Sequence, residues 1–302
     1  MLGRRVADAI ADSGPDALVS DDVVAVAGEA DLFVLNLECC ISERGRRWPD
    51  PQKPFFFRAP PAAIEVLRGL GVDCVTLANN HALDFGAEAL LDTFEHLRAA
   101  RIGWAGAGAD REQARRPALL EARGFRLAVL GCSDHPAAYA AGTASAGIAY
   151  GLDWLPEAIR RVEADAVLVT PHWGPNMGPE PLPLVRRAAE GLRDAGATLV
   201  AGHSAHVFHG VGPGVLYDLG DFLDDYIADP ELRNDLGLLF LVALDRAGPV
   251  RLEAVPLKLD FCHTRLAEGD DAAWARRRFR DACTVLGTDV EEKEGRLVLA
   301  WR

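Results

Sequence analysis

Side chains capable of metal binding and proton transfer follow four apolar runs of this sequence. They are Glu38 after residues 32–35, Asn80 and His81 after residues 75–78, His172 after residues 166–170, and His203 and His206 after residues 197–201. In open α/β sheets, ligands bind where buried parallel strands end, so we expect these side chains to converge. A carboxylate, an amide oxygen and imidazoles form a mixed nitrogen and oxygen set, which suits Mn, Fe or Zn better than Ca or Mg. The pattern therefore predicts a divalent-metal site.

The elements that must position this site are an alternating series of strands and helices. The apolar pattern predicts helices at 4–12, 16–29, 62–70, 86–101, 155–163 and 181–195. It predicts strands at 31–37, 72–78, 102–105, 125–132, 165–171 and 198–201. Such alternation favours a largely parallel sheet covered by helices.

The character of the sequence changes after residue 214. Strands are expected at 214–218, 237–244, 250–258 and 296–301, with one helix near 271–286. This part indicates a second, more antiparallel sheet packed against the first. Because no internal repeat, low-complexity tract or linker separates the two parts, we expect one domain over residues 1–302.

Composition and charge argue against nucleic acids and membranes as binding partners. The 302 residues are 49% hydrophobic and carry a formal net charge of −13, which would repel nucleic acid phosphates and anionic membrane surfaces. No run approaches the roughly 20 apolar residues of a membrane helix and no signal peptide is evident, so the sequence as given predicts a cytoplasmic protein. The six cysteines show no C-x-x-C spacing and are expected to be buried, reduced thiols.

A loop at 41–61 holds the main concentration of basic and aromatic residues in this acidic chain. Lys53 and Arg58 flank three consecutive phenylalanines at 55–57. If the loop folds over the metals, these cations could hold a carboxylate or a phosphate, with arginine better suited to bidentate contact. The alternative is a lid that only packs its aromatic rings on the core.

Other polar residues near the predicted site also have structural alternatives. Asn79 and Asn80 form a turn pair in which Asn80 is the expected ligand, and Asp84 could cap the next helix while orienting His81. The acidic patch at 218–235 could cap turns, or could bind substrate or metal. Two further histidines are assigned no role: His96 and His135.

A series of motifs follows one order along the chain: residues 36–38, 75–86, 103–108, 172–174, 202–206 and 217–222. This ordered set resembles the bacterial CapA family of poly-gamma-glutamate capsule-synthesis proteins, and the resemblance extends over nearly the whole chain. It implies membership of the calcineurin-like metallophosphatase superfamily. The implied fold is an α/β fold, a four-layer α/β/β/α sandwich with mixed sheets.

The resemblance also implies roles for the site residues. Glu38 would bridge two divalent metals about 3.5–4 Å apart, and His81 would donate a proton to the leaving oxygen. The other implied ligands are Asn80, His172, His203 and His206, with the last two divided between the metals. The residues expected to bind a small anionic substrate or a polyglutamate-like polymer are Arg4, Lys53, Arg58 and Asp221.

The sequence departs from the family pattern at three places. Relatives begin with a strand ending in Gly-Asp just before a segment like residues 1–4, and that Asp would bind the first metal. We therefore expect this chain to lack its first strand. Many relatives read His-His-Pro-His where residues 203–206 read His-Ser-Ala-His, and Asp221 stands where Asn is usual.

Three functions follow from these observations. The leading hypothesis is a metal-dependent hydrolase acting on a phosphoester or on a bond in an anionic cell-envelope or peptide-like polymer. A second is metal-dependent epimerisation of a peptide or amino-acid derivative, with His81 moving the proton. A third is a non-enzymatic capsule-assembly factor that binds poly-gamma-glutamate.

Overall fold

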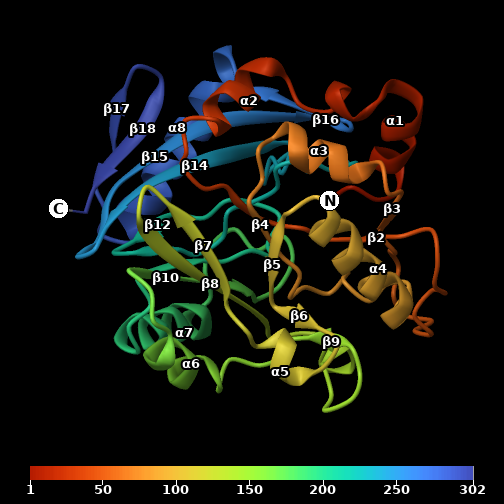
Figure 1. Ribbon diagram of the computed structural model, residues 1–302. Helices are drawn as coiled ribbons and strands as arrows, with labels where there is room; N and C mark the ends of the chain where they lie inside the picture. The colour runs from red at the N-terminus through yellow and green to blue at the C-terminus, as the bar shows by residue number, and fades with distance from the viewer. Residues whose placement is uncertain (302) are drawn as a thin grey trace.

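The N-terminal third of the chain forms a parallel sheet of three strands. The computed structural model describes residues 1–301 (Figure 1). The sheet order is β1 (Val34–Asn36), β4 (Cys74–Thr76) and β5 (Gly103–Ala105), with Leu35 beside Val75 and Val75 beside Trp104. The helices of this part are α1 (Arg5–Ser13), α2 (Asp21–Ala27), α3 (Ala63–Gly69) and α4 (Gly86–Ala99).

A mixed sheet of six strands occupies the middle of the chain. Its order is β12 (Val211–Gly212), β13 (Val215–Leu216), β11 (Leu199–Ala201), β10 (Ala166–His172), β8 (Phe125–Ser133) and β7 (Ala118–Ala122). All seven residues of β10 are buried, as its continuous apolar run predicts for a strand covered on both faces. Its helices are α5 (Arg111–Ala114), α6 (Leu155–Arg161) and α7 (Pro183–Asp194).

The C-terminal part is antiparallel, as expected. Its sheet order is β14 (Leu236–Asp245), β15 (Gly248–Asp260), β18 (Arg296–Ala300) and β17 (Glu291–Lys293), and β16 (His263–Leu266) also pairs with β15. The long helix α8 (Gly269–Val285) follows β16. Two small pairs complete the strands: β2 (Cys40–Ile41) with β3 (Arg58–Ala59), and β6 (Ala107–Gly108) with β9 (Gly147–Ile148).

Three groups of buried apolar side chains define the layers. The first lies between helices α1 to α4 and one face of strands β1, β4, β14 and β15. The second lies between those strands and the six-stranded sheet, and the third lies between that sheet and helices α6 and α7. Figure 1 shows α3 and α4 beside β4 and β5, and α6 and α7 beside β8 and β10. The predicted four-layer α/β/β/α sandwich with mixed sheets is thus confirmed.

Two of the expected elements differ from the structure. The helix predicted at 16–29 is wrong for residues 18–20, because Leu18 and Ser20 hydrogen-bond to Thr264 of β16 instead; the helix begins only at Asp21. The predicted loop at 41–61 contains β3, whose Arg58 pairs with Cys40. In both cases the partner strand is distant in the sequence, so local periodicity could not reveal it.

Two further expectations concern the whole chain. None of the helices within residues 1–301 is both long enough and apolar enough to cross a membrane. All six cysteines are buried and unpaired, as expected, and they are Cys39, Cys40, Cys74, Cys132, Cys262 and Cys283.

Asp235, in the turn just before β14, connects the antiparallel sheet to α8. Its carboxylate accepts hydrogen bonds from Arg233 and Lys258, and Arg233 also reaches Asp271 of α8. Burial alone would raise the pKa of Asp235, but these two cations outweigh it and lower the pKa to about 2. The ionised carboxylate therefore stabilises the folded chain.

We expect Asp235→Asn to lower the free energy of unfolding by about 2 kcal/mol at pH 7, measured by urea denaturation. Because the folded pKa lies below the unfolded value of about 3.9, this difference is fully present above that value. It should disappear as the pH falls through about 2. Asp260→Asn, in the exposed pair with Arg265, is the control and should change stability by less than about 0.5 kcal/mol. Equal losses in both variants would contradict this account.

Candidate metal and acid–base site

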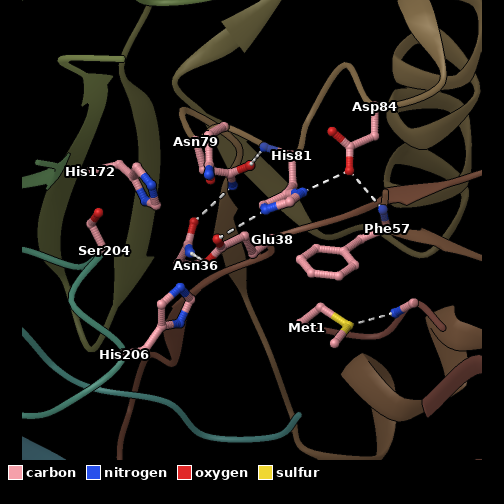
Figure 2. A network of polar contacts seen from close by, with 12 residues as sticks. Met1, Asn36, Glu38, Phe57, Asn79, His81, Asp84, His172, Ser204 and His206 are labelled. Atoms are coloured by element: carbon pink, nitrogen blue, oxygen red, sulfur yellow. Dashed lines mark hydrogen bonds and ion pairs between the residues drawn. The ribbon is translucent and has the colours of Figure 1, made fainter. Parts of the chain in front are cut away.

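The predicted site residues come together at the ends of four parallel strands. Glu38 follows β1 and His81 follows the neighbouring β4, while His172 ends β10 and His203 follows the neighbouring β11. His172 and His203 also form a parallel bridge across these two strand ends. Figure 2 shows His172 and His206 on one side of the cluster, facing Asn36, Glu38 and His81 on the other.

Two asparagines hold the carboxylate of Glu38 in place. The amide of Asn36 donates to Glu38 Oε2 at 3.2 Å, and Asn79 Nδ2 donates to Asn36 Oδ1 at 3.0 Å. Asn79 also accepts a hydrogen bond from the backbone N–H of His81. The amide chain therefore connects the ends of β1 and β4, and it leaves Glu38 Oε1 free of hydrogen bonds.

Asp84 orients His81. Its Oδ2 lies 2.7 Å from His81 Nδ1 and also accepts the backbone N–H of Phe57. The Phe57 ring packs 3.9 Å from the His81 ring, centroid to centroid. The imidazole is thereby fixed with Nε2 directed at Glu38, 3.9 Å from its Oε1.

The role of Asp84 as a helix cap is not observed. The N-cap residue of α4 is Phe85, and no side chain caps that helix. The carboxylate of Asp84 instead accepts four groups, which are the His81 ring, the Phe57 N–H, the Tyr139 hydroxyl and the Lys53 ammonium. Of the two roles predicted for Asp84, only the orientation of His81 is confirmed.

His172 and His203 form a buried pair of neutral imidazoles. Their Nδ1 atoms are 2.8 Å apart, so one ring donates to the other. Burial, together with the nearby positive charge of other histidines, lowers the pKa of His172 well below its usual value and lowers that of His203 to about 3. Both rings are therefore neutral near neutral pH. The ring that donates through Nδ1 has its lone pair on Nε2, free for a metal, whereas the ring that accepts carries its proton on Nε2.

Gly202 allows His203 to reach this position. A side chain at residue 202 would collide with the indole of Trp173 and the carbonyl of Tyr217. The backbone then turns through Ser204 at φ 135° and His206 at φ 60°, which are costly conformations for residues other than glycine. The segment is therefore held in a strained turn that directs both histidines inward.

His206 differs in charge from His172 and His203, because its ring holds a proton near neutral pH. Its Nδ1 lies 2.9 Å from Asp221 Oδ1. Although burial lowers the pKa of His206, the Asp221 carboxylate outweighs burial and raises it to about 10. Asp221 in turn keeps a lowered pKa, while burial and the Asp221 charge raise the pKa of Asp224 to about 8. The structure thus pairs two residues that were predicted separately, one as a ligand and one for substrate.

Buried atoms without hydrogen-bond partners gather in this cluster. They are Glu38 Oε1, Asn80 Oδ1, His172 Nε2, His203 Nε2 and Asp221 Oδ2. Because buried polar atoms are normally paired, such a concentration points to a bound group. Among residues 1–301, however, no three His, Cys, Asp or Glu side chains stand in an arrangement that would hold a metal ion. The donor set therefore fits a metal only if the histidine pairs rearrange.

The predicted substrate-binding residues divide into two groups. Lys53 reaches the site, because its Nζ lies 2.7 Å from the Asn80 carbonyl and 3.1 Å from Asp84 Oδ1. Arg4 pairs with Asp225 and lies over the Phe55 ring. The guanidinium of Arg58 lies over the Phe85 ring and donates to the Arg44 carbonyl, so these contacts do not bring it to the metal-ligand candidates.

His135 is a site residue that the sequence argument missed. Its ring lies 5.0 Å from the His172 ring, centroid to centroid, and its Nδ1 pairs with Asp134. The signal was present, because His135 follows the end of β8, which neighbours β10. The rule applied to the other strand ends would have included it.

Comparisons with known proteins place the chain in a family. Residues 1–226 match the family model described as bacterial capsule synthesis protein PGA_cap. The chain belongs to the PGA_cap family. It is 34% identical over 297 residues to a "Probable polyglutamine synthesis accessory protein" of Mycobacterium tuberculosis, with 89% of this chain and 76% of that protein covered.

Other PGA_cap relatives are more distant. The "Capsule biosynthesis protein CapA" of Bacillus anthracis is 28% identical, with 86% of this chain and 65% of that protein covered. The "PGA biosynthesis protein CapA" of Bacillus subtilis is 25% identical, with 86% and 69% covered. Among solved structures, a hypothetical protein from Thermus thermophilus is similar at a TM-score of 0.43 and 14% identity, with 83% of this chain and 93% of that chain covered.

We expect His81 to carry its proton on Nδ1, toward Asp84, and to leave Nε2 without one. Nitrogen-15 NMR of histidine-labelled protein distinguishes the two tautomers. Asp84→Asn should weaken the preference, because an amide oxygen is a poorer acceptor than a carboxylate. His96 on α4 is the internal control and should not respond. A His81 ring with its proton on Nε2 would contradict the assignment.

Proposed function

We propose that this PGA_cap protein is a metal-dependent hydrolase. The observation that carries the proposal is the group of unpaired, buried oxygen and nitrogen atoms that lie after four strand ends. Mn, Fe and Zn bind mixed ligand sets of oxygen and imidazole nitrogen. A structural role would not need so many unsatisfied buried atoms, because each of them costs free energy.

The residues that would hold the metals are those with free atoms. Glu38 Oε1 and Asn80 Oδ1 would contribute oxygen. His172 and His203 would both contribute Nε2 only once the hydrogen bond between their Nδ1 atoms is broken, because that bond places the proton of one neutral ring on Nε2. Two bound metals would activate a water molecule and neutralise charge on the reacting group. His206 could become a ligand only on losing its proton, so proton and metal would compete for it.

His81 is suited to transfer a proton at the bond that breaks. With Nδ1 held by Asp84, the unprotonated Nε2 faces the cluster, where it can accept the proton that the attacking water loses and pass that proton to the leaving oxygen. In hydrolysis, water supplies the hydroxyl that one product keeps, and this proton completes the other product. The Phe57 ring, which is fully buried against His81, keeps solvent from that side of the imidazole.

The substrate we propose is an anionic polymer or a smaller anionic ester. The relatives named for polyglutamine synthesis and for PGA and capsule biosynthesis support a polyglutamate-like chain. In a protein with a net charge of −13, such a polyanion needs local positive charge. Lys53 supplies part of it at the site, and bound metals would supply more.

We expect activity on bis(4-nitrophenyl) phosphate or on poly-gamma-glutamate only after chelated protein is reloaded with Mn²⁺. His172→Ala and Glu38→Gln should each weaken Mn²⁺ binding by at least about 100-fold, since even residues that only support ligands cost 10–100-fold. Calorimetric titration with Mn²⁺ measures the binding, and release of nitrophenol or of shortened polymer measures the activity.

His96→Ala on α4 is the matched control and should keep both metal affinity and turnover. If His172→Ala and Glu38→Gln both keep the Mn²⁺ affinity of the unmodified protein, the proposal is wrong. Binding of poly-gamma-glutamate that persists after chelation, without any product, would instead support a polymer-binding accessory role.

A further inference from the structure

A second cavity lies between α8 and the segment at 179–186, which leads into α7. Its volume is about 420 Å³, which is within the range of small-molecule sites, and none of the metal-ligand candidates lines it. Its charged lining consists of three guanidinium groups and two carboxylates, which are Arg186, Arg277 and Arg278 with Glu180 and Asp281. The cavity therefore has a local excess of positive charge in a chain whose net charge is −13.

Arg278 is a half-buried cation without an anionic partner. Within residues 1–301 its Nη2 donates to the Pro179 carbonyl at 3.1 Å, but its buried Nε has no hydrogen-bond partner. Burial lowers the pKa of Arg278, and no carboxylate offsets this effect. Two other half-buried arginines, Arg233 and Arg296, each contact two carboxylates. Because desolvated cations are normally paired, the environment of Arg278 points to a bound anion.

Two aromatic rings hold the Arg278 guanidinium in place. Its central carbon lies 5.6 Å from the Trp274 ring centroid and 5.9 Å from that of Phe208, which is buried. Contacts with aromatic rings use the faces of a guanidinium group and leave the N–H groups at its edge for a carboxylate. Since the side chain is already ordered, it loses little further freedom when a ligand binds.

The walls of the cavity are fixed by close backbone contacts. A Cβ atom at Gly210 would lie 2.4 Å from the carbonyl group of Ala282, so only glycine lets α8 approach this closely. His209 donates from Nε2 to the Gly178 carbonyl at 2.9 Å, and Arg186 donates from Nε to the Pro181 carbonyl at 3.2 Å. The segments that form the cavity are thus joined to one another.

The lining also favours one kind of anion. Arg277 is exposed and forms no ion pair within residues 1–301, while Arg186 lies 3.9 Å from its carboxylate partner, Glu180. A compact phosphate would place its double charge at one point near Glu180 and Asp281, and it would leave the apolar part of the wall uncovered. Carboxylates separated by methylene groups would instead reach different arginines and cover that wall.

We propose that this cavity binds a ligand with at least two carboxylates spaced along an aliphatic chain, one of them held by Arg278. A free dicarboxylate and the end of a glutamate-containing chain both have this chemistry. The site is separate from the metal-ligand candidates and requires no metal. The proposal is therefore independent of the proposed hydrolase activity.

The test is a titration of protein from which metal and then chelator have been removed, so that binding through metals does not contribute. The probes are glutarate, a peptide of four glutamates, and inorganic phosphate. We expect both carboxylate probes to bind saturably, and phosphate to bind at least about tenfold more weakly. In NMR of tryptophan labelled with nitrogen-15, the carboxylate probes should shift the indole N–H signal of Trp274. Trp104 of β5, which stacks on Phe94, is the internal control and should not shift.

Three variants locate the binding. Arg278→Ala should weaken the binding of both carboxylate probes at least about tenfold, because it removes a charge-assisted hydrogen-bond donor. Arg277→Ala changes an exposed side chain, so it should fold normally and weaken the binding at least about threefold. Arg280→Ala removes the same charge from the same helix, but Arg280 pairs with Glu292 and does not line the cavity. It is the matched control and should keep the affinity.

The affinities of the two carboxylate probes identify the source of the ligand. At least about tenfold tighter binding of the glutamate peptide supports the end of a chain, and equal affinities support a free dicarboxylate. The proposal is wrong if neither carboxylate probe binds, or if phosphate binds as tightly as glutarate. It is also wrong if the Arg277 and Arg278 variants both bind as the Arg280 variant does.

Discussion

Burial of polar side chains where parallel strands end is the constraint on which this structure depends. Polar side chains lie just after the strand ends, in apolar surroundings: a carboxylate, three asparagine amides and several imidazoles. Each polar atom left unpaired there costs about 1–3 kcal/mol of folding free energy. Hydrogen bonds within the fold offset part of that cost. Asn36 and Asn79 form them around Glu38, and Asp84 forms one with His81. Five of the ten buried side-chain atoms that lack a hydrogen-bond partner within residues 1–301 belong to this cluster.

The same constraint produces two kinds of imidazole a few residues apart. His203, without a carboxylate partner, stays neutral because charging it in a buried place is unfavourable. His206 has Asp221 beside it and holds its proton strongly. The charge of His206 is neutralised by the ionised Asp221, so the site combines neutral imidazoles with one buried ion pair.

The sequence was sufficient for the fold class and for the convergence of the site, because both follow from apolar runs and from the residues that end them. His172 beside His203 is an example, since parallel neighbouring strands bring their ends together. Partnerships between distant segments could not be predicted in this way. The pairing of residues 18–20 with Thr264, the pairing of Arg58 with Cys40, and the position of Arg58 away from the ligands all depend on tertiary packing. His135 was missed for another reason, because a rule already in use was not applied to it.

The most direct test of the central claim is whether histidine nitrogen binds the metal. Pulsed electron paramagnetic resonance of Mn²⁺-loaded protein detects the coupling of the metal electron spin to nitrogen in its ligands. We predict imidazole nitrogen coupling that changes on nitrogen-15 labelling of histidine and is lost in His172→Ala/His203→Ala. A Mn²⁺ spectrum with no nitrogen coupling would contradict the account, because the ion would then be held without the residues that define the site.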